Sequence, residues 1–504
     1  MLWLWLTTHA FAADLLVDVG DDWCATLSSA VAGDRVLLAP GTHTGTCAIT
    51  PAGEEGNPVI FSVQDTERRA ILSSTGVGIN LLDLYGGELV VEGIDFGPTE
   101  INAEAIRLHA GDRVTIRDCS FDHIGGQAIV ANTAGSTYSD ILIEDSTFTD
   151  LTASAITVGC FAGSADCSAS SVVVQRNRID GAASGSGIVF ERDAVGHIAH
   201  NTVSGTLGPA VRVGGDAADG GGVEAPAAGE LPSTVVEGNH LSGSATDATL
   251  TVDGGPVLVR NNVVLSGTLG ALVVTDPSAT DRMDHIHVLG NSLAGGSGPV
   301  VSLDGWSETA TLSFQVNGVW DPTSPGAGVP SPIGALPWAG NADCSSETAC
   351  FEDITAGDPS PRAGGDLVGV GIEVADGLLP VDLCGDSRAV GDPAGALVSS
   401  LADPMSLTAD TDPTQHCTTS GPDDTGIEDT GIEDTAGPGP RPGTGPDNRV
   451  PGTVDTAAPA LPSWSAAWKA GETGGVSCST AGVAASWSAL LIGLFAAARR
   501  RQDR

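Results

Sequence analysis

Eight short segments of the chain share one pattern, and this pattern decides the fold: VTIRDCSF (114–121), ILIEDSTF (141–148), VVVQRNRI (172–179), HIAHNTV (197–203), TVVEGNHL (234–241), VLVRNNVV (257–264), IHVLGNSL (286–293) and LSFQVNGV (312–319). Aligned on one polar position, the segments place there Cys119, Ser146, Asn177, Asn201, Asn239, Asn262, Asn291 and Asn317. Successive members of this column are 23 to 38 residues apart. Such a repeat length predicts one coil of a solenoid per segment, with loops filling the longer steps.

Two apolar columns flank the polar position. Three residues before it stand Ile116, Ile143, Val174, Ile198, Val236, Val259, Val288 and Phe314, and two residues after it stand Phe121, Phe148, Ile179, Val203, Leu241, Val264, Leu293 and Val319. The residues between them are mostly polar, and alternation of inward and outward side chains is the period of a β-strand. A single coil cannot shield its apolar stripe, so we expect the coils to stack and to bury one continuous core.

The column of Asn residues is best explained by turn chemistry. Asn tolerates a left-handed φ at a tight bend, and stacked side-chain amides can bond one another from coil to coil. A row of amides that binds a ligand is the alternative. Cys119 stands in the same column, and we expect it to be a small buried residue rather than a nucleophile.

With these repeats the chain resembles the pectin-lyase-like right-handed β-helix superfamily over residues 14–320. The opening AGDRVLLAPGTHTGTCAI (32–49) is similar to the first coil of that group, and the IxxNx-apolar segments are similar to its repeats. The resemblance implies an all-β fold, a right-handed parallel β-helix. It implies little about function, because one fold hosts many activities.

Residues 321–420 contain many Pro and Gly and few strand-like runs. Asp382 to Arg388, followed by Gly391 to Ala396, is similar to an ending that often follows such solenoids. We therefore expect an irregular cap over the last open coil, in which Asp382 and Arg388 form an ion pair or a turn.

The two ends of the chain predict export. Residues 1–13 are short and apolar and end in an Ala-x-Ala pattern, which indicates a signal peptide. Residues 421–475 carry a repeated DTGIE and many Pro and Gly, which favours a disordered linker. In residues 476–504, Cys478 precedes an apolar stretch and three Arg residues. This order closely resembles the myxobacterial C-terminal sorting signal (MYXO-CTERM).

That resemblance implies that Cys478 is processed or modified for attachment at the outer cell surface. A permanent anchor, in which the single hydrophobic helix of this segment stays in the membrane, is the alternative and predicts a similar location.

Charge limits the partners. The 504 residues hold 63 acidic and 21 Lys or Arg residues, for a formal net charge of −42. Such a surface repels nucleic acid and anionic membrane surfaces. A polysaccharide or a component of the cell envelope remains as the expected partner, and we expect a monomer.

Ten cysteines fit an oxidising compartment. Proximity in sequence suggests pairs of Cys24 with Cys47, Cys160 with Cys167, Cys344 with Cys350, and Cys384 with Cys417. Cys119 and Cys478 are then left without a partner. Because no CxxC or Cys/His cluster is present, a structural zinc site is not expected.

Catalytic residues are not evident. The resemblance implies a Lys or Arg base with calcium-holding acids in lyases, or clustered Asp in hydrolases, yet the chain's one Lys is Lys469, in the linker. One polar cluster contains Arg107, His109, Asp112, Arg113, Arg117, Asp118, Asp122 and His123, of which Arg113, Arg117, Asp118 and His123 are the catalytic candidates. A second contains Asp281, Asp284, His285 and His287, which are candidate metal ligands. For both, solvated surface charge is the simpler reading. No cofactor is firmly predicted, although acidic clusters leave calcium open.

Two functions stay open. The first is a non-catalytic surface protein that binds carbohydrate or an envelope partner. The second is a carbohydrate-active enzyme, a polysaccharide lyase or glycoside hydrolase, and it rests on the fold alone. A structural spacer in the envelope is a third and weaker idea.

Overall fold

The computed structural model describes residues 12–160, 167–214, 231–275, 285–296, 299–304, 312–330, 337–374, 378–399, 401, 405 and 412–417. The predicted signal peptide, the linker and the sorting segment with Cys478 lie outside these residues. Within the described ranges no helix is both long and apolar enough to span a bilayer.

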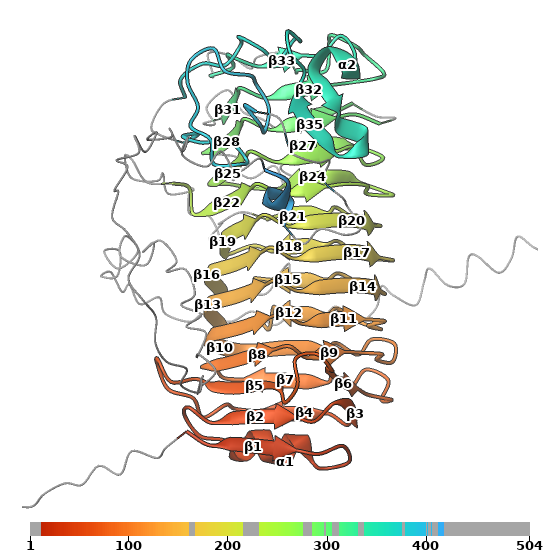
Figure 1. Cartoon of the computed structure of the whole chain (residues 1–504), viewed down its shortest axis with the longest axis vertical. Helices are drawn as coiled ribbons and strands as arrows, with labels where there is room; N and C mark the ends of the chain where they lie inside the picture. The colour runs from red at the N-terminus through yellow and green to blue at the C-terminus, as the bar shows by residue number, and fades with distance from the viewer. Residues whose placement is uncertain are drawn as a thin grey trace, which may run out of the picture. The chain divides into compact units, whose positions relative to one another are not determined.

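Three parallel sheets run along the stacked coils (Figure 1). Sheet A contains β1 (Asp14–Val17), β2 (Arg35–Leu38), β5 (Val59–Val63), β8 (Leu89–Glu92), the second half of β10 (Ile106–Arg117), β13 (Thr137–Glu144), β16 (Ser168–Gln175), β19 (Ala194–Ala199), β22 (Thr234–Glu237), β25 (Val257–Arg260), β28 (Ile286–Leu289) and β31 (Leu312–Gln315). Sheet B contains β3 (Gly41–Thr44), β6 (Ala70–Ser73), β9 (Asp95–Phe96), β11 (Ser120–Asp122), β14 (Thr147–Leu151), β17 (Arg178–Ala182), β20 (Thr202–Thr206), β23 (His240–Leu241), β26 (Val263–Leu265), β29 (Ser292–Ala294), β32 (Gly318–Trp320) and β33 (Ala342–Asp343). Sheet C contains β4 (Cys47–Ile49), β7 (Leu82–Tyr85), the first half of β10, β12 (Ile129–Ala131), β15 (Ile156–Val158), β18 (Ile188–Phe190), β21 (Val211–Val213), β24 (Ala248–Val252), β27 (Gly270–Thr275) and β30 (Val301–Asp304).

Each coil passes through sheets A, B and C in turn, so that equivalent residues stack in register. Ile116 pairs with Val91 in the preceding coil and with Ile143 in the following one. Both predicted apolar columns point inward and are fully buried. In sheet B, the rings of Phe96, Phe121 and Phe148 stack at 5.0 and 4.7 Å between centroids. Burial of each such side chain stabilises the fold by roughly 1.5–3 kcal/mol. The predicted parallel β-helix is confirmed.

The Asn column lies inside the bend from sheet A to sheet B. Each amide Nδ2 donates to the amide Oδ1 of the next coil, at 3.0 Å from Asn177 to Asn201 and 2.9 Å from Asn239 to Asn262. We call Asn177, Asn201, Asn239, Asn262, Asn291, Asn317 and Asn341 the Asn ladder. The Asn ladder has one member more than the sequence repeats predicted. A ninth bend from sheet A to sheet B is formed by Trp338, Gly340 and Asn341, and Asn341 is the additional member.

The predicted stacking of the side-chain amides is confirmed, but the predicted left-handed φ at the Asn residues is wrong. The left-handed φ belongs to the residue before each ladder position, for example Arg176 at 52° and Asn261 at 55°. The ladder residue itself points inward, where its amide satisfies backbone groups that the bend removes from the sheets.

The two ends of the core are closed by Trp side chains. At the first coils, Trp23 of α1 (Trp23–Ser29) is buried and its ring stacks on Phe61 at 5.7 Å. At the last coil, the ring of Trp338 stacks on Phe314 at 5.2 Å. The parallel stacking continues to β33, beyond the expected boundary at residue 320.

The segment after β33 contains short elements: α2 (Glu347–Cys350), β34 (Phe351–Asp353), η1 (Ile354–Ala356), β35 (Asp358–Pro361) and η3 (Pro413–His416). It covers apolar side chains on the outside of the late coils, including Val235, Leu258 and Leu289. It therefore covers the flank of these coils, in addition to the end for which a cap was expected.

Asp382 and Arg388 both stabilise this segment, but each binds different partners. Asp382 accepts hydrogen bonds from the backbone N–H groups of Cys384, Asp386 and Val398 at 2.9 Å each, which makes it a turn residue. The Arg388 guanidinium donates to the Pro393 and Gly395 carbonyls and to Asn261 Oδ1. The expected turn is present, and no ion pair joins these two described residues.

All four predicted disulfides are formed: Cys24–Cys47, Cys160–Cys167, Cys344–Cys350 and Cys384–Cys417. Within the described chain, Cys119 is the free cysteine, and it is buried as expected. Burial raises the pKa of its thiol to about 12. This thiol is therefore protonated at neutral pH and cannot serve as a nucleophile.

Candidate functional site

The outer face of sheet C carries an unusual set of side chains where β7, β10 and β12 lie side by side. We call this set the sheet C platform: Asp83, Tyr85, Arg107, His109, Val130 and Asn132. Strand alternation turns the strand residues of this set away from the core, although Val130 is only 1% exposed, and Asn132 directly follows β12. Their neighbours Leu82, Leu84, Ile106 and Leu108 are fully buried in the core. Register pairs Arg107 with Asp83 on one side and with Val130 on the other.

An aromatic pair forms one end of the platform. The rings of Tyr85 and His109 stack at 4.2 Å with an angle of 1° between their planes. His109 Nε2 lies 2.8 Å from Asp83 Oδ1, which also accepts a 2.9 Å hydrogen bond from Asn80 Nδ2. The Tyr85 side chain is nevertheless 50% exposed. Because His109 covers one face of the ring, an aromatic surface remains available to a ligand.

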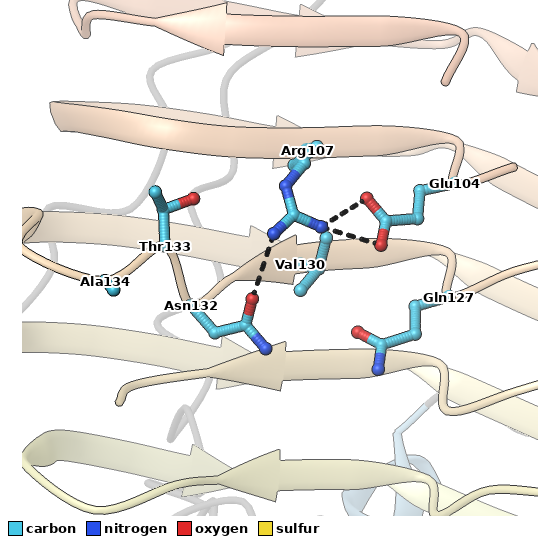
Figure 2. A pocket seen from close by; sticks show the side chains of 7 residues that line it. All are labelled: Glu104, Arg107, Gln127, Val130, Asn132, Thr133 and Ala134. Atoms are coloured by element: carbon cyan, nitrogen blue, oxygen red, sulfur yellow. Dashed lines mark hydrogen bonds and ion pairs between the residues drawn. The ribbon is translucent and has the colours of Figure 1, made fainter. Parts of the chain in front are cut away.

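A hollow of about 380 Å³ forms the other end (Figure 2). It is lined by Glu104, Arg107, Gln127, Val130, Asn132, Thr133 and Ala134. Arg107 Nη1 donates to both carboxylate oxygens of Glu104 at 2.8 and 2.9 Å, and Arg107 Nη2 donates to Asn132 Oδ1 at 3.4 Å. The volume lies within the range of small-ligand sites.

The loop that borders the hollow is fixed by one buried ring. The Tyr138 hydroxyl accepts from the Thr133 backbone N–H at 2.9 Å and donates to the Leu108 carbonyl at 3.1 Å. The Ser136 hydroxyl donates to the His109 carbonyl at 2.5 Å. These bonds hold the hollow in shape without a ligand.

The charged groups of the platform and its hollow include two carboxyl groups, Asp83 and Glu104, and one guanidinium, Arg107. Burial raises the pKa of the Glu104 carboxyl, and the charge of Asp83 adds to this rise, although the bonds and charge of Arg107 lower it. The positive charge of Arg107 is already engaged by Glu104. The hollow is therefore poorly suited to an anionic ligand, and its lining combines polar groups with apolar surface.

Two buried polar atoms in the lining have no partner among the described residues: Gln127 Oε1 and Thr133 Oγ1. A buried acceptor or hydroxyl without a partner costs free energy unless water or a ligand reaches it. Both residues border the hollow, but these two atoms are themselves buried.

The structure separates the predicted catalytic residues. Arg113 lies at the bend from sheet C to sheet A and pairs with Glu88, which raises its pKa. Arg117 lies on sheet A and pairs with Glu92 at 2.6 Å. Asp118 lies at the next bend, where it binds Arg69 at 2.5 Å. Arg113 and Arg117 are thus each engaged by a carboxylate of the preceding coil.

His123 lies on a different side of the coil, at the bend from sheet B to sheet C. Its Nδ1 is 2.7 Å from Asp122 Oδ2, and its Nε2 is 3.7 Å from Asp150 Oδ2. The hydrogen bond with Asp122 raises the pKa of His123. These three exposed groups lie close enough to share a cation. Sequence reasoning placed His123 beside Asp122 but missed Asp150, which comes from the next coil.

The predicted metal cluster is only partly within the described residues. Asp281 and Asp284 lie outside them. His287 points outward on β28, and its Nδ1 is 2.7 Å from Ser313 Oγ. His285 precedes β28 with a φ of 53°. The metal site proposed from these four residues therefore stays a prediction.

Sequence reasoning named Arg107 and His109 but missed the rest of the platform. The strand sequences LDLY (82–85) and IRLH (106–109) place polar or aromatic residues at both outward positions of two coils. This shared pattern could have predicted the platform from the sequence. Gln127 and Asn132 could not have been predicted in this way, because they lie beyond the two ends of the short strand β12.

Comparison with known proteins identifies the fold. The family model described as "right handed beta helix region" matches residues 72–314. No curated protein matches the sequence.

Several solved structures are similar at low identity. An alginate lyase from a Paenibacillus species is 17% identical, with a TM-score of 0.37, 62% of this chain covered and 88% of the lyase covered. A pectate lyase is 11% identical, with a TM-score of 0.37 and coverages of 78% and 97%. A family PL6 polysaccharide lyase from Pseudopedobacter saltans is 12% identical, with a TM-score of 0.34 and coverages of 71% and 100%.

These likenesses are too weak to transfer an activity. The family match and the stacked parallel coils agree on the architecture: the chain folds as a right-handed parallel β-helix.

Proposed function

We propose that this protein is an exported, non-catalytic β-helix protein that binds a neutral glycan on its sheet C platform. The observation that carries the proposal is the half-exposed Tyr85 ring, stacked on His109 beside a preformed hollow. A sugar ring has an apolar C–H face that suits an aromatic surface. Its hydroxyl groups suit planar polar side chains such as those of Asp83, Asn132 and Gln127.

The charges of the platform and of the whole chain favour a neutral ligand. The formal net charge is −42, and the nearest cation, Arg107, is already paired with Glu104. A polyuronate would meet repulsion without a free guanidinium to offset it. We therefore expect neutral polysaccharides to bind and pectate or alginate to bind poorly.

The same pairing argues against a lyase. Removal of a proton beside a uronate needs an uncharged base and a positive group on the carboxylate. Arg113 and Arg117 form ion pairs with Glu88 and Glu92, and they lie outside the platform's sheet. A Lys base is not available in the β-helix, since Lys469 is the chain's only Lys.

One observation favours a glycoside hydrolase as a second candidate. Hydrolases use two carboxyl groups, of which one has a raised pKa and serves as the acid. Burial raises the pKa of Glu104, and Asp83 interacts with it. Both oxygens of Glu104, however, accept hydrogen bonds from Arg107, which favour the ionised form and oppose this rise.

Export and anchoring belong to the same proposal. Four formed disulfides are typical of an oxidising compartment. The segment 476–504, with Cys478, would hold the β-helix at the outer surface, either as a sorting signal or as a membrane helix. A polysaccharide or envelope component would then be the partner of a monomeric chain.

A glycan array probed with the full-length chain tests the binding. We expect hits among neutral glycans, and a loss of these hits in Tyr85→Ala, because the variant removes the aromatic surface. Leu16→Ala is the matched control, since Leu16 is a 65% exposed side chain on β1, outside the platform. Repeating the array in calcium and in EDTA tests the open question of a cation. A blank array, or a Tyr85→Ala variant that binds like the wild type, overturns the proposal.

A cleavage assay separates the two candidate functions. Each glycan that binds is incubated with the wild-type chain and with Glu104→Gln, and new reducing ends are measured. Binding without new reducing ends supports the non-catalytic function. Cleavage by the wild type that Glu104→Gln abolishes establishes the hydrolase instead.

A further inference from the structure

Three side chains from two successive coils meet at the bend from sheet B to sheet C. Asp122 ends β11 and His123 follows it, while Asp150 belongs to the neighbouring strand β14 (Figure 1). His123 and Asp150 occupy equivalent positions in their coils and both have a left-handed φ, of 55° and 50°. One polar atom from each of the three side chains lies within 4.8 Å of the other two. We call these residues the Asp-His-Asp cluster.

Asp122 fixes the orientation of the imidazole ring. Its Oδ2 accepts from His123 Nδ1 at 2.7 Å, and its Oδ1 accepts from the Thr149 hydroxyl at 2.6 Å. With the hydrogen on Nδ1, a neutral imidazole presents the lone pair of Nε2. A carboxylate that holds the far nitrogen of a histidine in this way is the usual partner of an imidazole that binds a metal.

The distance from His123 Nε2 to Asp150 Oδ2 suits one metal ion bound by both atoms. Two ligand atoms at about 2.0–2.2 Å from a tetrahedral zinc ion lie roughly 3.4 Å from each other. The observed distance is 3.7 Å, which is too long for a hydrogen bond but close to that separation. An imidazole and a carboxylate are also ligand types that zinc accepts, whereas calcium takes oxygen ligands.

Both ligand side chains are accessible from solution. The His123 side chain is 62% exposed and the Asp150 side chain is 72% exposed, and both residues border a second hollow of about 380 Å³. Among the described residues, His123 is the ion-pair partner of both carboxylates. When the imidazole is neutral, the cluster therefore carries two negative charges, which attract a divalent cation.

We infer that the Asp-His-Asp cluster binds a divalent transition-metal ion of the zinc type. His123 Nε2 and Asp150 would be the protein ligands, and Asp122 would position the imidazole without touching the ion. Water would complete the coordination on the side of the hollow, so the site would be weaker than one with four protein ligands. The inference is independent of glycan binding, because the cluster lies at a bend outside the sheet C platform.

Calorimetric titration of the full-length chain with zinc chloride tests this site. A pH of 7.5 limits competition from protons, because the hydrogen bond with Asp122 raises the pKa of His123. His123→Asn and Asp150→Asn should each abolish one zinc site, and Asn tolerates the left-handed φ of both positions. Asp122→Asn should weaken the same site by about tenfold or more, as the loss of an orienting carboxylate does. Circular dichroism checks that each variant is folded.

Asp140→Asn is the matched control, because Asp140 is an exposed carboxylate with a φ of 53° outside the cluster. This variant and Tyr85→Ala should bind zinc like the wild type, so a blank glycan array leaves the inference intact. Equal zinc binding by the wild type, His123→Asn and Asp150→Asn overturns it. An equal loss in Asp140→Asn also overturns it, since net charge alone would then hold the ion. Displacement of zinc by an equal concentration of calcium would contradict the role of the imidazole.

Discussion

The side-chain amide of Asn262 illustrates how single residues hold the coils together. Its Oδ1 accepts from the backbone N–H and the amide of Asn239, and its Nδ2 donates to the Val236 and Arg260 carbonyls. Asn262 is fully buried, so no water can replace these partners. The Asn ladder therefore stabilises the bend from sheet A to sheet B and also joins each coil to the next.

Replacing Asn262 by Ala should destabilise the protein by about 3 kcal/mol or more, because several buried groups lose their partners at once. Urea unfolding of the wild type and the variant measures this loss. Asn262→Ser is the matched control. In this column, Ser146 Oγ already accepts from the Cys119 N–H and donates to the Glu144 carbonyl. The serine variant should lose clearly less stability, and an equal loss in both variants would contradict the role of the hydrogen bonds.

Cys119 should be inert in the folded protein. Burial raises the pKa of its thiol to about 12, and the residue is 1% exposed. In a Cys478→Ser background, an aromatic disulfide reagent at pH 8 should find no reactive thiol in the native chain and one after unfolding in denaturant. Rapid reaction of the native protein would show that this part of the core is open.

At the scale of elements, neighbouring strands are joined by charges as well as by backbone bonds. Glu237 at the end of β22 lies 2.8 Å from His197 of β19 and 2.5 Å from Arg260 of β25. Burial alone would raise the pKa of Glu237, but the bonds and charges of His197 and Arg260 outweigh burial and lower it to about 2. The carboxylate thus links three adjacent coils.

This pKa predicts a loss of stability in acid. A carboxyl whose pKa is lower in the folded state stabilises the fold above its unfolded pKa of about 4.3, and this contribution disappears as the pH falls toward 2. The contribution corresponds to about 3 kcal/mol. We expect Glu237→Gln to be less stable than the wild type at pH 7 and to differ from it little near pH 2.

Urea unfolding at pH 7, 4.5 and 2.5 measures this convergence. Glu55→Gln is the control, because Glu55 is exposed and its removal should leave the pH dependence unchanged. A constant difference between the wild type and Glu237→Gln at all three pH values would contradict the inter-strand role of the carboxylate.

At the scale of the whole molecule, repetition makes the β-helix modular. Ser146 and Asn177 occupy the same column 31 residues apart, and Thr147 pairs with Arg178. Deleting residues 147–177 removes one whole coil and the Cys160–Cys167 disulfide together. We expect this variant to fold with the β-sheet circular dichroism of the parent, because every remaining strand keeps its register.

A deletion one residue longer, 147–178, is the sharpest control. It shifts β17 by one residue, which turns Ile179 outward and its polar neighbours inward. This variant should be far less stable than the 147–177 deletion, as thermal unfolding would show. Equal stability of the two variants would contradict the strict register that the stacked columns imply.

The fold was predictable from sequence and most of the platform was not, for a common reason. The columns around Ile116 and Phe121 recur in every repeat, so stacking follows from their spacing, and the disulfides join cysteines close in sequence. Grouping Arg113, Arg117 and His123 by proximity failed, because residues 113–123 contain three bends, at Arg113, Asp118 and His123, so the side chains lie on different sides of the coil. Tyr85 and His109 meet across coils, where the register depends on loop lengths that sequence patterns do not specify.

Chemical nitration of Tyr85 tests the central claim most directly. The chain has two tyrosines, of which Tyr138 is 1% exposed and Tyr85 is 50% exposed, so a tyrosine-specific reagent reports on the platform alone. The nitration rate is measured with and without a saturating amount of a glycan found on the array. Glycan binding at the sheet C platform predicts a marked slowing of Tyr85 nitration. An unchanged rate at saturation would place the glycan elsewhere and contradict the assigned binding surface.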